Sequence, residues 1–310
     1  MKVLIIGTGA VGGFYGLKLL KNGVDVTFTA RNITYRILKE QGIILDSFET
    51  GIEKFGKINL LEFSELSRIN NKYDLILVCV KSYNTQETAA VIKNLIHQKS
   101  CVISMQNGLE NEDILSKYID PENVAGAVVF ISSALEKNIV KHTGAGILKI
   151  GKISKSPKYD IELIKNIFTE SGVACTVSDN IMLDLWIKIL WNASFNALSV
   201  VLEATVSDMI NDDNSRNLLR AVMEEAVKVA HAAGYKIPHS KIDKNLDIEN
   251  NAGEFKTSML QDFEKKKKLE FEFINGAIVR FADKYGVSAP INKMLINILS
   301  YKERKNMNSN

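Results

Sequence analysis

Three polar side chains recur every four positions in an otherwise mostly apolar stretch. Lys188, Asn192 and Asn196 stand within Trp186–Asn196. On a helix, each step of four residues advances about 400° and rises about 6 Å, so the three side chains form one slowly drifting polar stripe. A lysine in a largely buried setting is costly unless it has a partner. The stretch predicts a mostly buried helix. The lysine and amides could hold a polar ligand. The alternative for the lysine is an ion pair with a carboxylate that serves only structure.

Glu270 is the acid that we expect to face Lys188. It alternates with aromatic residues in the stretch Glu270–Phe273, just before a predicted helix, so its carboxylate is expected to be partly buried. The preceding run Lys265–Lys268 is most simply a solvated face. A protonated lysine beside a carboxylate can stabilise a developing negative charge and supply a proton.

A glycine-rich pattern lies between two predicted strands at the N-terminus. The strand Lys2–Ile6 leads directly into it, a helix to about Lys21 follows, and Val24–Thr29 forms the second strand. The pattern consists of Gly7, Thr8, Gly9, Ala10, Val11 and Gly12. Its glycines allow a tight turn, a close approach to a pyrophosphate and helix–strand packing, and the helix N-terminus favours phosphate. This order of elements predicts dinucleotide binding.

The end of the second strand distinguishes NAD from NADP. An NAD site usually has an acid there to bind the ribose 2′-hydroxyl. This strand instead ends at Ala30 and Arg31, and Asp25 stands too early in the strand to serve. Arg31 is placed where a 2′-phosphate would sit, although an ordinary surface charge is the alternative. We therefore expect NADP(H) as the cofactor.

Two more polar groups follow predicted strands. Lys81 comes after the strand Tyr73–Val80, and Asn107 comes after the strand Ser100–Ser104. Ligands of open α/β sheets bind beyond the carboxyl ends of the strands, so both residues are candidates for contact with cofactor or substrate. Asn107-Gly108 is also a dipeptide that favours a turn, which is the alternative explanation.

The pattern of elements predicts an α/β fold in two domains. Residues 1–178 are expected to form a Rossmann-type dinucleotide-binding domain. Within it, strands at 124–131, 139–142 and 147–150 are expected to extend the sheet in antiparallel fashion. Residues 179–310 are expected to form an all-helical domain for substrate binding and catalysis. Helical runs there cover 180–198, 213–234, 258–268, 275–285 and 291–303, and the polar tail 304–310 is expected to fray.

Composition excludes several other classes of function. The net charge of +3 among 310 residues, with no basic stretch interleaved with aromatics, gives no indication of nucleic-acid binding. No run of 18 apolar residues predicts a membrane span, and no metal site is predicted. The three cysteines cannot all pair and stand in apolar strand-like runs, as expected for reduced core thiols of a cytoplasmic protein.

These stretches together resemble the ketopantoate reductase (2-dehydropantoate 2-reductase) family over nearly the whole chain. The resemblance rests on Gly7–Gly12, Val80-Lys81, Gln106–Gly108, Trp186–Ile189 with Asn192 and Asn196, Thr257–Asp262, Glu270 and Ile274–Gly276. It implies a Rossmann domain joined to an all-helical domain, with the active site in the cleft between them. It also implies a small 2-keto acid as substrate and leaves a homodimer open.

The resemblance also implies individual roles. Lys188 matches the catalytic proton donor, and Glu270 matches the acid that binds the substrate. The residues that match substrate-positioning groups are Asn192, Asn196 and Ser258; those that match groups near the nicotinamide are Lys81 and Asn107; and Arg31 matches the 2′-phosphate partner. At Phe255 some members have a more polar residue, so this chain is expected to lack one of the hydrogen bonds to substrate that those members make.

Three functions are consistent with this sequence. The first is NADPH-dependent reduction of ketopantoate to (R)-pantoate, on the route to pantothenate and coenzyme A. The second is the same chemistry on another branched 2-keto acid, giving a D-2-hydroxy acid. The third is a non-catalytic protein that senses NADP. A protein of this third kind should have lost Lys188 or its acid partner, and both are present.

Overall fold

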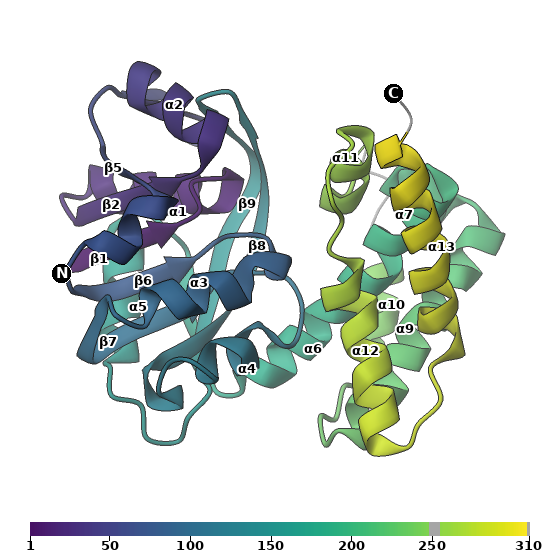
Figure 1. Ribbon diagram of the computed structural model, residues 1–310. Helices are drawn as coiled ribbons and strands as arrows, with labels where there is room; N and C mark the ends of the chain where they lie inside the picture. The colour runs from purple at the N-terminus through teal and green to yellow at the C-terminus, as the bar shows by residue number, and fades with distance from the viewer. Residues whose placement is uncertain (248–254, 309–310) are drawn as a thin grey trace. The chain divides into compact units, whose positions relative to one another are not determined.

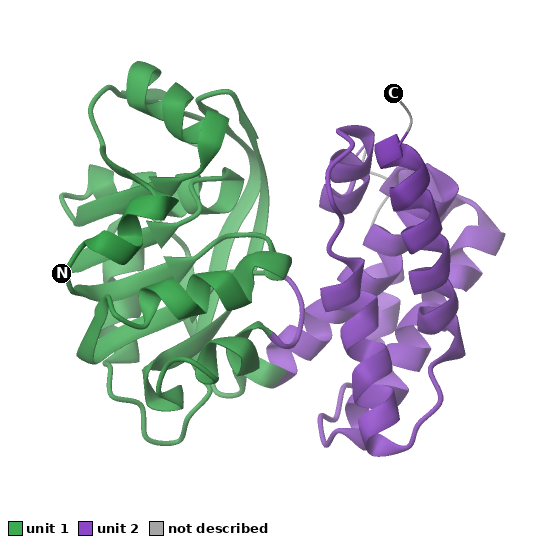
Figure 2. Cartoon of the chain, in the orientation of Figure 1, with its two compact units in different colours: residues 1–106, 111–182 green, residues 107–110, 183–310 purple. Residues whose placement is uncertain are grey.

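The computed structural model describes residues 1–247 and 255–308. The chain divides into two compact units, coloured separately in Figure 2. The first unit contains residues 1–106 and 111–182, and the second contains residues 107–110 and 183–310. The short segment Asn107–Glu110 therefore belongs to the second unit, although both of its neighbours in the chain belong to the first.

One sheet organises the first unit. Its strands are β1 (Lys2–Ile6), β2 (Asp25–Ala30), β3 (Ile43–Ser47), β4 (Gly51–Phe55), β5 (Asn59–Glu62), β6 (Tyr73–Val78), β7 (Ile96–Ser104), β8 (Val124–Glu136), β9 (Ile139–Lys152) and β10 (Cys175–Ser178). Six of them run parallel in the spatial order β5-β2-β1-β6-β7-β8. This is the order of a Rossmann-type dinucleotide-binding sheet, so the predicted fold class is confirmed.

The sheet continues beyond β8 differently from the prediction. β8 joins the sheet parallel to β7, and only β9 runs antiparallel to β8. The segments 139–142 and 147–150 are not separate strands but parts of the long strand β9. The β8–β9 register shifts at Phe130/Ile131 and at Ser132/Ser133, so the glycine-rich stretch at 144–146 is absorbed as bulges. The other edge of β9 pairs with β3 at 139–142 and with β10 at 148–151.

Helices cover the sheet on both faces (Figure 1). They are α1 (Ala10–Lys21), α2 (Asn32–Gln41), α3 (Thr85–Ile92), α4 (Asn111–Ser116) and α5 (Ile161–Glu170), with short 3₁₀ turns η1 (Phe63–Arg68), η2 (Ser82–Asn84) and η3 (Pro121–Asn123). Alternate residues of a strand point to opposite faces. Accordingly, Val3 and Ile5 pack in one apolar cluster and Leu4 and Ile6 in the other.

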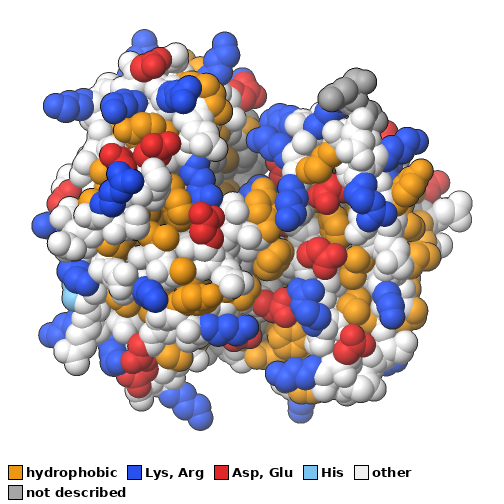
Figure 3. Space-filling model, in the orientation of Figure 1, with side chains coloured by type: hydrophobic (Ala, Val, Ile, Leu, Met, Phe, Trp, Pro, Cys, Tyr) orange, Lys and Arg blue, Asp and Glu red, His pale blue; other side chains and the backbone are white. Residues whose placement is uncertain are grey.

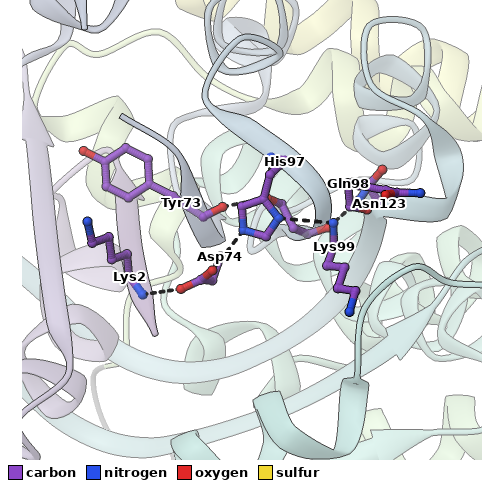
Figure 4. A network of polar contacts seen from close by, with 8 residues as sticks. Lys2, Tyr73, Asp74, His97, Gln98, Lys99 and Asn123 are labelled. Atoms are coloured by element: carbon purple, nitrogen blue, oxygen red, sulfur yellow. Dashed lines mark hydrogen bonds and ion pairs between the residues drawn. The ribbon is translucent and has the colours of Figure 1, made fainter. Parts of the chain in front are cut away.

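A polar network joins the beginnings of neighbouring strands (Figure 4). The backbone N–H of Lys2 on β1 donates to Asp74 on β6 over 2.6 Å, and the His97 ring on β7 lies 2.9 Å from the same carboxylate. Partial burial raises the pKa of Asp74, but these hydrogen bonds outweigh it, and the pKa is lowered overall. The network lies at the amino ends of the strands, opposite the edge where such sheets bind ligands, so its role is structural.

The second unit is helical in its described residues. Its helices are α6 (Ile181–Trp191, whose first two residues belong to the first unit), the π-helical segment η4 (Asn192–Asn196), α7 (Ala197–Leu202), α8 (Val206–Asn211), α9 (Asp213–Ala232), α10 (Ser240–Leu246), α11 (Ser258–Glu264), α12 (Phe271–Tyr285) and α13 (Pro290–Asn308). The prediction of a frayed tail from 304 was wrong as far as Asn308, since α13 runs to that residue. α12 also begins four residues before the predicted start.

One long helix of the described chain resembles a membrane span by length and composition. It is the continuous helix 181–202, which has a mean hydropathy of 1.4 over its most apolar window. Within that window 72% of the residues are buried inside the protein. Burial of this extent is what a core helix requires, and it agrees with the predicted mostly buried helix.

Charged side chains of both signs are interspersed on the face shown in Figure 3. Lysine and arginine side chains alternate there with aspartate and glutamate side chains and with small apolar areas. This mixture is consistent with the small net charge of +3.

Candidate active site

The glycine-rich turn has the geometry that its sequence predicts. Gly7 has a φ of +96°, and a Cβ there would lie 2.8 Å from the Val80 side chain. A Cβ on Gly12 would lie 2.2 Å from the Gly7 carbonyl oxygen, so the helix α1 can pack against the turn only with glycine at this position. At Gly9 a Cβ would meet no described atom within 4 Å, so this side of the backbone is open.

Hydrogen bonds from β2 hold the turn in place. The Thr8 hydroxyl donates to the Thr29 carbonyl over 2.8 Å, and the Gly7 N–H donates to the Thr29 hydroxyl over 3.1 Å. The helix α1 begins immediately afterwards, with Gly9 at its N-cap and no acid in its first turn. Free N–H groups at this helix end favour a phosphate, so these residues fit the pyrophosphate of a dinucleotide.

Arg31 follows β2, as predicted, and stands at the N-cap of α2. Its guanidinium carbon lies 3.7 Å from the centroid of the Phe63 ring, and Nη2 is 2.8 Å from a carboxylate oxygen of Glu87. The Nε–H is buried and has no hydrogen-bond partner among the described residues. The side chain is therefore held by a ring face and one ion pair, with donor capacity left over for an anion.

Lys81 and the segment after β7 flank the carboxyl ends of neighbouring strands. Lys81 is half-buried and stands at the N-cap of η2. Gln106 donates to the Val80 carbonyl over 3.0 Å and to the Thr85 hydroxyl over 2.8 Å. Thr85 in turn donates to Asn111 over 2.9 Å. Both ends of the segment Asn107–Glu110 are thus fixed by the same buried group of hydrogen bonds.

The segment Asn107–Glu110 packs on the start of α12. Gly108 has a φ of +108°, and a Cβ there would lie 2.5 Å from the Phe273 carbonyl oxygen. The Glu110 carboxylate accepts a hydrogen bond from the Nε–H of Arg280 over 3.0 Å and another from Nη2 of the same guanidinium. Glycine at 108 is therefore needed for the close approach to the Phe273 carbonyl, in addition to favouring the turn at Asn107-Gly108.

The predicted polar helix contains an interruption that the sequence did not reveal. Lys188 lies in the last turn of α6, and Asn192 and Asn196 begin and end the π-helical segment η4. Both asparagines are buried, at 5% and 4% exposure, whereas Lys188 is half-buried. Single π-helical turns occur frequently at functional sites.

Residues from four parts of the second unit meet at one small pocket: the segment Asn107–Glu110, η4, α11 and α12 with its N-cap. It is lined by Asn107, Asn196, Ser258, Met259, Asp262, Glu270 and Ile274. Asn192 reaches the same place through Asn107, since its Nδ2 donates to the Asn107 Oδ1 over 3.4 Å. The lining combines amide, hydroxyl and carboxylate groups with two apolar side chains, as a site for a small polar ligand requires.

Lys188 and Glu270 interact electrostatically, as the sequence led us to expect. Burial lowers the pKa of Lys188 to about 8, and the nearby Glu270 carboxylate opposes this shift. Glu270 is 7% exposed and occupies the N-cap of α12, but its side chain makes no capping hydrogen bond. The carboxylate is therefore directed to the pocket rather than to the end of its own helix.

The start of α11 brings Ser258 and Asp262 to the pocket. The Thr257 hydroxyl caps this helix by accepting the Leu260 N–H over 3.2 Å. The same hydroxyl lies 2.7 Å from that of Ser199 on α7, and both residues are fully buried. Ser258 follows the cap directly, so its position is fixed by α7 as well as by its own helix.

The predicted residues thus fall into two groups. Those in the second unit are Lys188, Glu270, Asn107, Asn192, Asn196 and Ser258, and they lie at or beside one pocket. Those in the first unit are Gly7–Gly12, Arg31 and Lys81. Met259, Asp262 and Ile274 also line the pocket, although the sequence analysis gave them no role. All three stand within stretches that it had singled out. In the described residues, no group of three or more His, Cys, Asp or Glu side chains could hold a metal ion.

The fold defines a class of protein in which a Rossmann-type dinucleotide-binding unit is followed by a helical unit. Residues 3–155 match the family described as Ketopantoate reductase PanE/ApbA, and residues 180–303 match the family described as Ketopantoate reductase PanE/ApbA C terminal. The chain therefore belongs to the ketopantoate reductase family.

Individual relatives agree with this assignment. The 2-dehydropantoate 2-reductase of Pyrococcus horikoshii is 28% identical over 303 residues, which cover 98% of each chain. The crystal structure of a PanE/ApbA family ketopantoate reductase from Ralstonia eutropha JMP134 has a TM-score of 0.88 and 32% identity, covering 99% of each chain. The ternary structure of D-mandelate dehydrogenase with NADH and anilino(oxo)acetate has a TM-score of 0.91 and 25% identity, also covering 99% of each chain.

Proposed function

We propose that this protein is a 2-dehydropantoate 2-reductase, which reduces ketopantoate to (R)-pantoate with NADPH. The observation that carries the proposal is the Lys188–Glu270 pair beside a pocket of amide and hydroxyl groups. Membership of the ketopantoate reductase family and the similarity to the Pyrococcus horikoshii relative support the choice of substrate. The product would serve pantothenate and coenzyme A synthesis, in the cytoplasm.

The proposed cofactor residues are those of the first unit together with Asn107. The turn Gly7–Gly12 and the start of α1 would bind the pyrophosphate, and Arg31 would bind the 2′-phosphate of NADPH. Lys81 and Asn107 would contact the nicotinamide end. When bound, the reduced nicotinamide supplies a hydride to the ketone carbon of the substrate.

Lys188 is the proton donor in this mechanism. A lysine with a pKa of about 8 is mostly protonated at neutral pH, yet it gives up its proton more readily than a solvated lysine. Its ammonium group stabilises the negative charge on the ketone oxygen as the C–H bond forms, and then transfers the proton that makes the hydroxyl group. Glu270 keeps the lysine charged before the reaction, because its carboxylate raises the pKa that burial lowers.

The remaining pocket residues orient the substrate. Asn107, Asn192, Asn196 and Ser258 offer neutral hydrogen-bonding groups to the carboxylate and the 4-hydroxyl of ketopantoate. Groups of this kind fix the orientation without adding charge that would shift the pKa of Lys188 further. Glu270 can also accept the 4-hydroxyl, which would tie recognition of the substrate to the proton donor.

A second candidate is the reduction of another branched 2-keto acid to a D-2-hydroxy acid. The similarity to D-mandelate dehydrogenase, at 25% identity and a TM-score of 0.91, favours it. The apolar pocket residues Met259 and Ile274 would accept a larger hydrophobic side chain. A homodimer is compatible with either activity.

Steady-state kinetics with NADPH and a panel of 2-keto acids tests both candidates. The panel contains ketopantoate, its analogue without the 4-hydroxyl, 2-ketoisovalerate and phenylglyoxylate. We expect the highest kcat/KM for ketopantoate. A higher value for phenylglyoxylate or 2-ketoisovalerate would replace the proposed function by the second candidate. Failure to reduce any of the four would refute both.

A further inference from the structure

The π-helical segment η4 changes the direction in which Asn196 points. On an unbroken α-helix, eight residues advance about 800°, so Asn196 would point about 80° away from Lys188 around the axis. A π turn has a wider ring, closed by an i→i+5 hydrogen bond, and advances less per residue. The π turn therefore reduces the rotation of Asn196 away from Lys188 and turns Asn196 toward the pocket that it lines with Glu270.

Side-chain donors bind several backbone carbonyl groups at and next to this segment. The Ser194 hydroxyl donates to the Leu190 carbonyl over 2.6 Å, and the Ser199 hydroxyl donates to the Asn196 carbonyl over 2.9 Å. Both serines belong to the same continuous helix and would move with it. A donor from another helix also binds this segment, because the Asn275 Nδ2 on α12 donates to the Ala193 carbonyl over 2.9 Å.

Asn275 is itself anchored by a buried chain of hydrogen bonds. Its Nδ2 also donates to the Asn292 Oδ1 over 3.0 Å, so both amide hydrogens are used. The Asn292 Nδ2 donates to the Glu225 carboxylate over 2.7 Å, and that carboxylate also accepts the backbone N–H groups of Ile291 and Asn292 at the start of α13. Asn275 and Asn292 are fully buried, and Glu225 is 8% exposed.

The unused atom of Asn275 indicates that its two N–H donors are the reason for an amide at this position. Its Oδ1 is buried and has no hydrogen-bond partner in the described part of the chain. A buried polar atom without a partner is destabilising. An apolar residue would remove this oxygen but would leave the Ala193 carbonyl and the Asn292 Oδ1 without the donor that binds them.

We propose that Asn275, anchored by Asn292 and Glu225, is a positioning residue that holds the π turn and so directs Asn196 at the substrate. This inference rests on the proposed function, because it takes the pocket as the site of the 2-keto acid. Asn275 does not line the pocket and acts through the backbone of Ala193. It belongs to the Ile274–Gly276 stretch, of which only Ile274 touches the pocket.

The test compares Asn275→Ala with Ile278→Ala. Ile278 is fully buried one turn further along α12 and makes no polar contact with η4, so its truncation controls for a loss of stability. We expect both variants to lower the Tm. Only Asn275→Ala should raise the KM for ketopantoate, by about tenfold to 100-fold, since small misplacements of substrate-binding groups have effects of this size. The KM for NADPH should not change in either variant.

A second variant and a crystal structure complete the test. Glu225→Gln keeps the size of the anchor and removes its charge, so it should raise the KM for ketopantoate in the same direction, by a smaller factor. It decides the question if Asn275→Ala does not fold. Crystal structures of Asn275→Ala, or of Glu225→Gln in that case, and of the wild type should differ in the path of residues 192–196.

The outcomes separate this inference from the proposed function. If the wild type reduces no 2-keto acid, the proposed function fails and the crystal structures still decide the role of Asn275. If the wild type is active, and the Asn275 variant behaves kinetically as Ile278→Ala does, the positioning role is refuted. An unchanged π turn in the crystal structure of the variant refutes it as well.

Discussion

We predict that a preference for NADPH over NADH depends on Arg31 and can be changed at Glu87. Arg31 stands at the end of β2, where Ala30 replaces the acid that binds the ribose of NADH in related folds. Its guanidinium stacks on Phe63 and pairs with Glu87 at 2.8 Å. A 2′-phosphate would compete with Glu87 for this cation, so we expect the carboxylate to weaken any preference for NADPH that Arg31 creates.

The expected magnitudes differ for the two residues. A hydrogen bond to a charged group contributes about 1.5–3 kcal/mol, which is roughly tenfold to 140-fold in affinity. Arg31→Ala should raise the KM for NADPH by such a factor and leave the KM for NADH nearly unchanged. The Arg31–Glu87 pair is exposed, at 36% and 54%, and exposed pairs contribute about 0.2–1 kcal/mol. Glu87→Gln should therefore raise the preference for NADPH by no more than about fivefold.

Steady-state kinetics with both cofactors measures these ratios. Arg36→Ala serves as the matched control, because Arg36 is an exposed arginine one turn further along the same helix and forms no ion pair in the described structure. We expect it to change neither KM. Equal losses for NADPH and NADH in Arg31→Ala would show that Arg31 acts on the fold or on the adenine alone. A fall in NADPH preference in Glu87→Gln would refute the competition between carboxylate and phosphate.

Three further predictions concern Lys188 and Glu270. Lys188→Ala should lower kcat by about 10²–10⁴, the effect of losing a positioned proton donor, with an unchanged KM for NADPH. Near wild-type kcat, or an unfolded protein in thermal denaturation, would remove the basis for this role. The kcat/KM for ketopantoate should fall as the pH rises through about 8, because only protonated Lys188 donates. Glu270→Gln removes the charge that raises this pKa, so the fall should move to lower pH, and a fall that stays in place or moves to higher pH would contradict the assignment. Finally, Glu270→Ala should impair turnover of ketopantoate more than that of its analogue without the 4-hydroxyl; equal losses would mean that Glu270 serves only Lys188.

The glycine-rich turn of the first unit was predictable from local sequence because its constraints are local. Gly7 and Gly12 allow backbone approaches that no side chain permits, so their spacing alone identifies the turn. The length of β9 was not predictable in the same way. Glycines at 144 and 146 suggested a turn, but pairing with β8, β3 and β10 keeps the strand continuous through bulges. Contacts with distant strands outweighed the local preference.

The pairing of Lys188 with Glu270 was predictable from the free-energy cost of burying a lysine, not from a sequence motif. A lysine on a mostly apolar helix needs an acid, and Glu270 stood in a stretch where an acid would be partly buried. The role of Asp262 in lining the pocket was not predictable by this argument. Its position on α11 shows only that it lies on one face of that helix. Which face points toward the pocket follows from the Thr257 cap and the hydrogen bond of Thr257 to Ser199.

The polar stripe of the long helix was inferred from a regular α-helical spacing, which does not account for the π-helical segment at Asn192–Asn196. Four-residue steps on an α-helix bring Asn192 close to the direction of Lys188 and leave Asn196 about 80° away. No residue type in Asn192–Asn196 signals a π turn, because the turn depends on a donor from α12 more than 80 positions away in the chain. The fourfold spacing therefore identified the right residues, while their convergence depends on the wider turn. A designed variant that restores a regular α-helix at residues 192–196 should keep Lys188 in place and lose the contribution of Asn196 to the pocket.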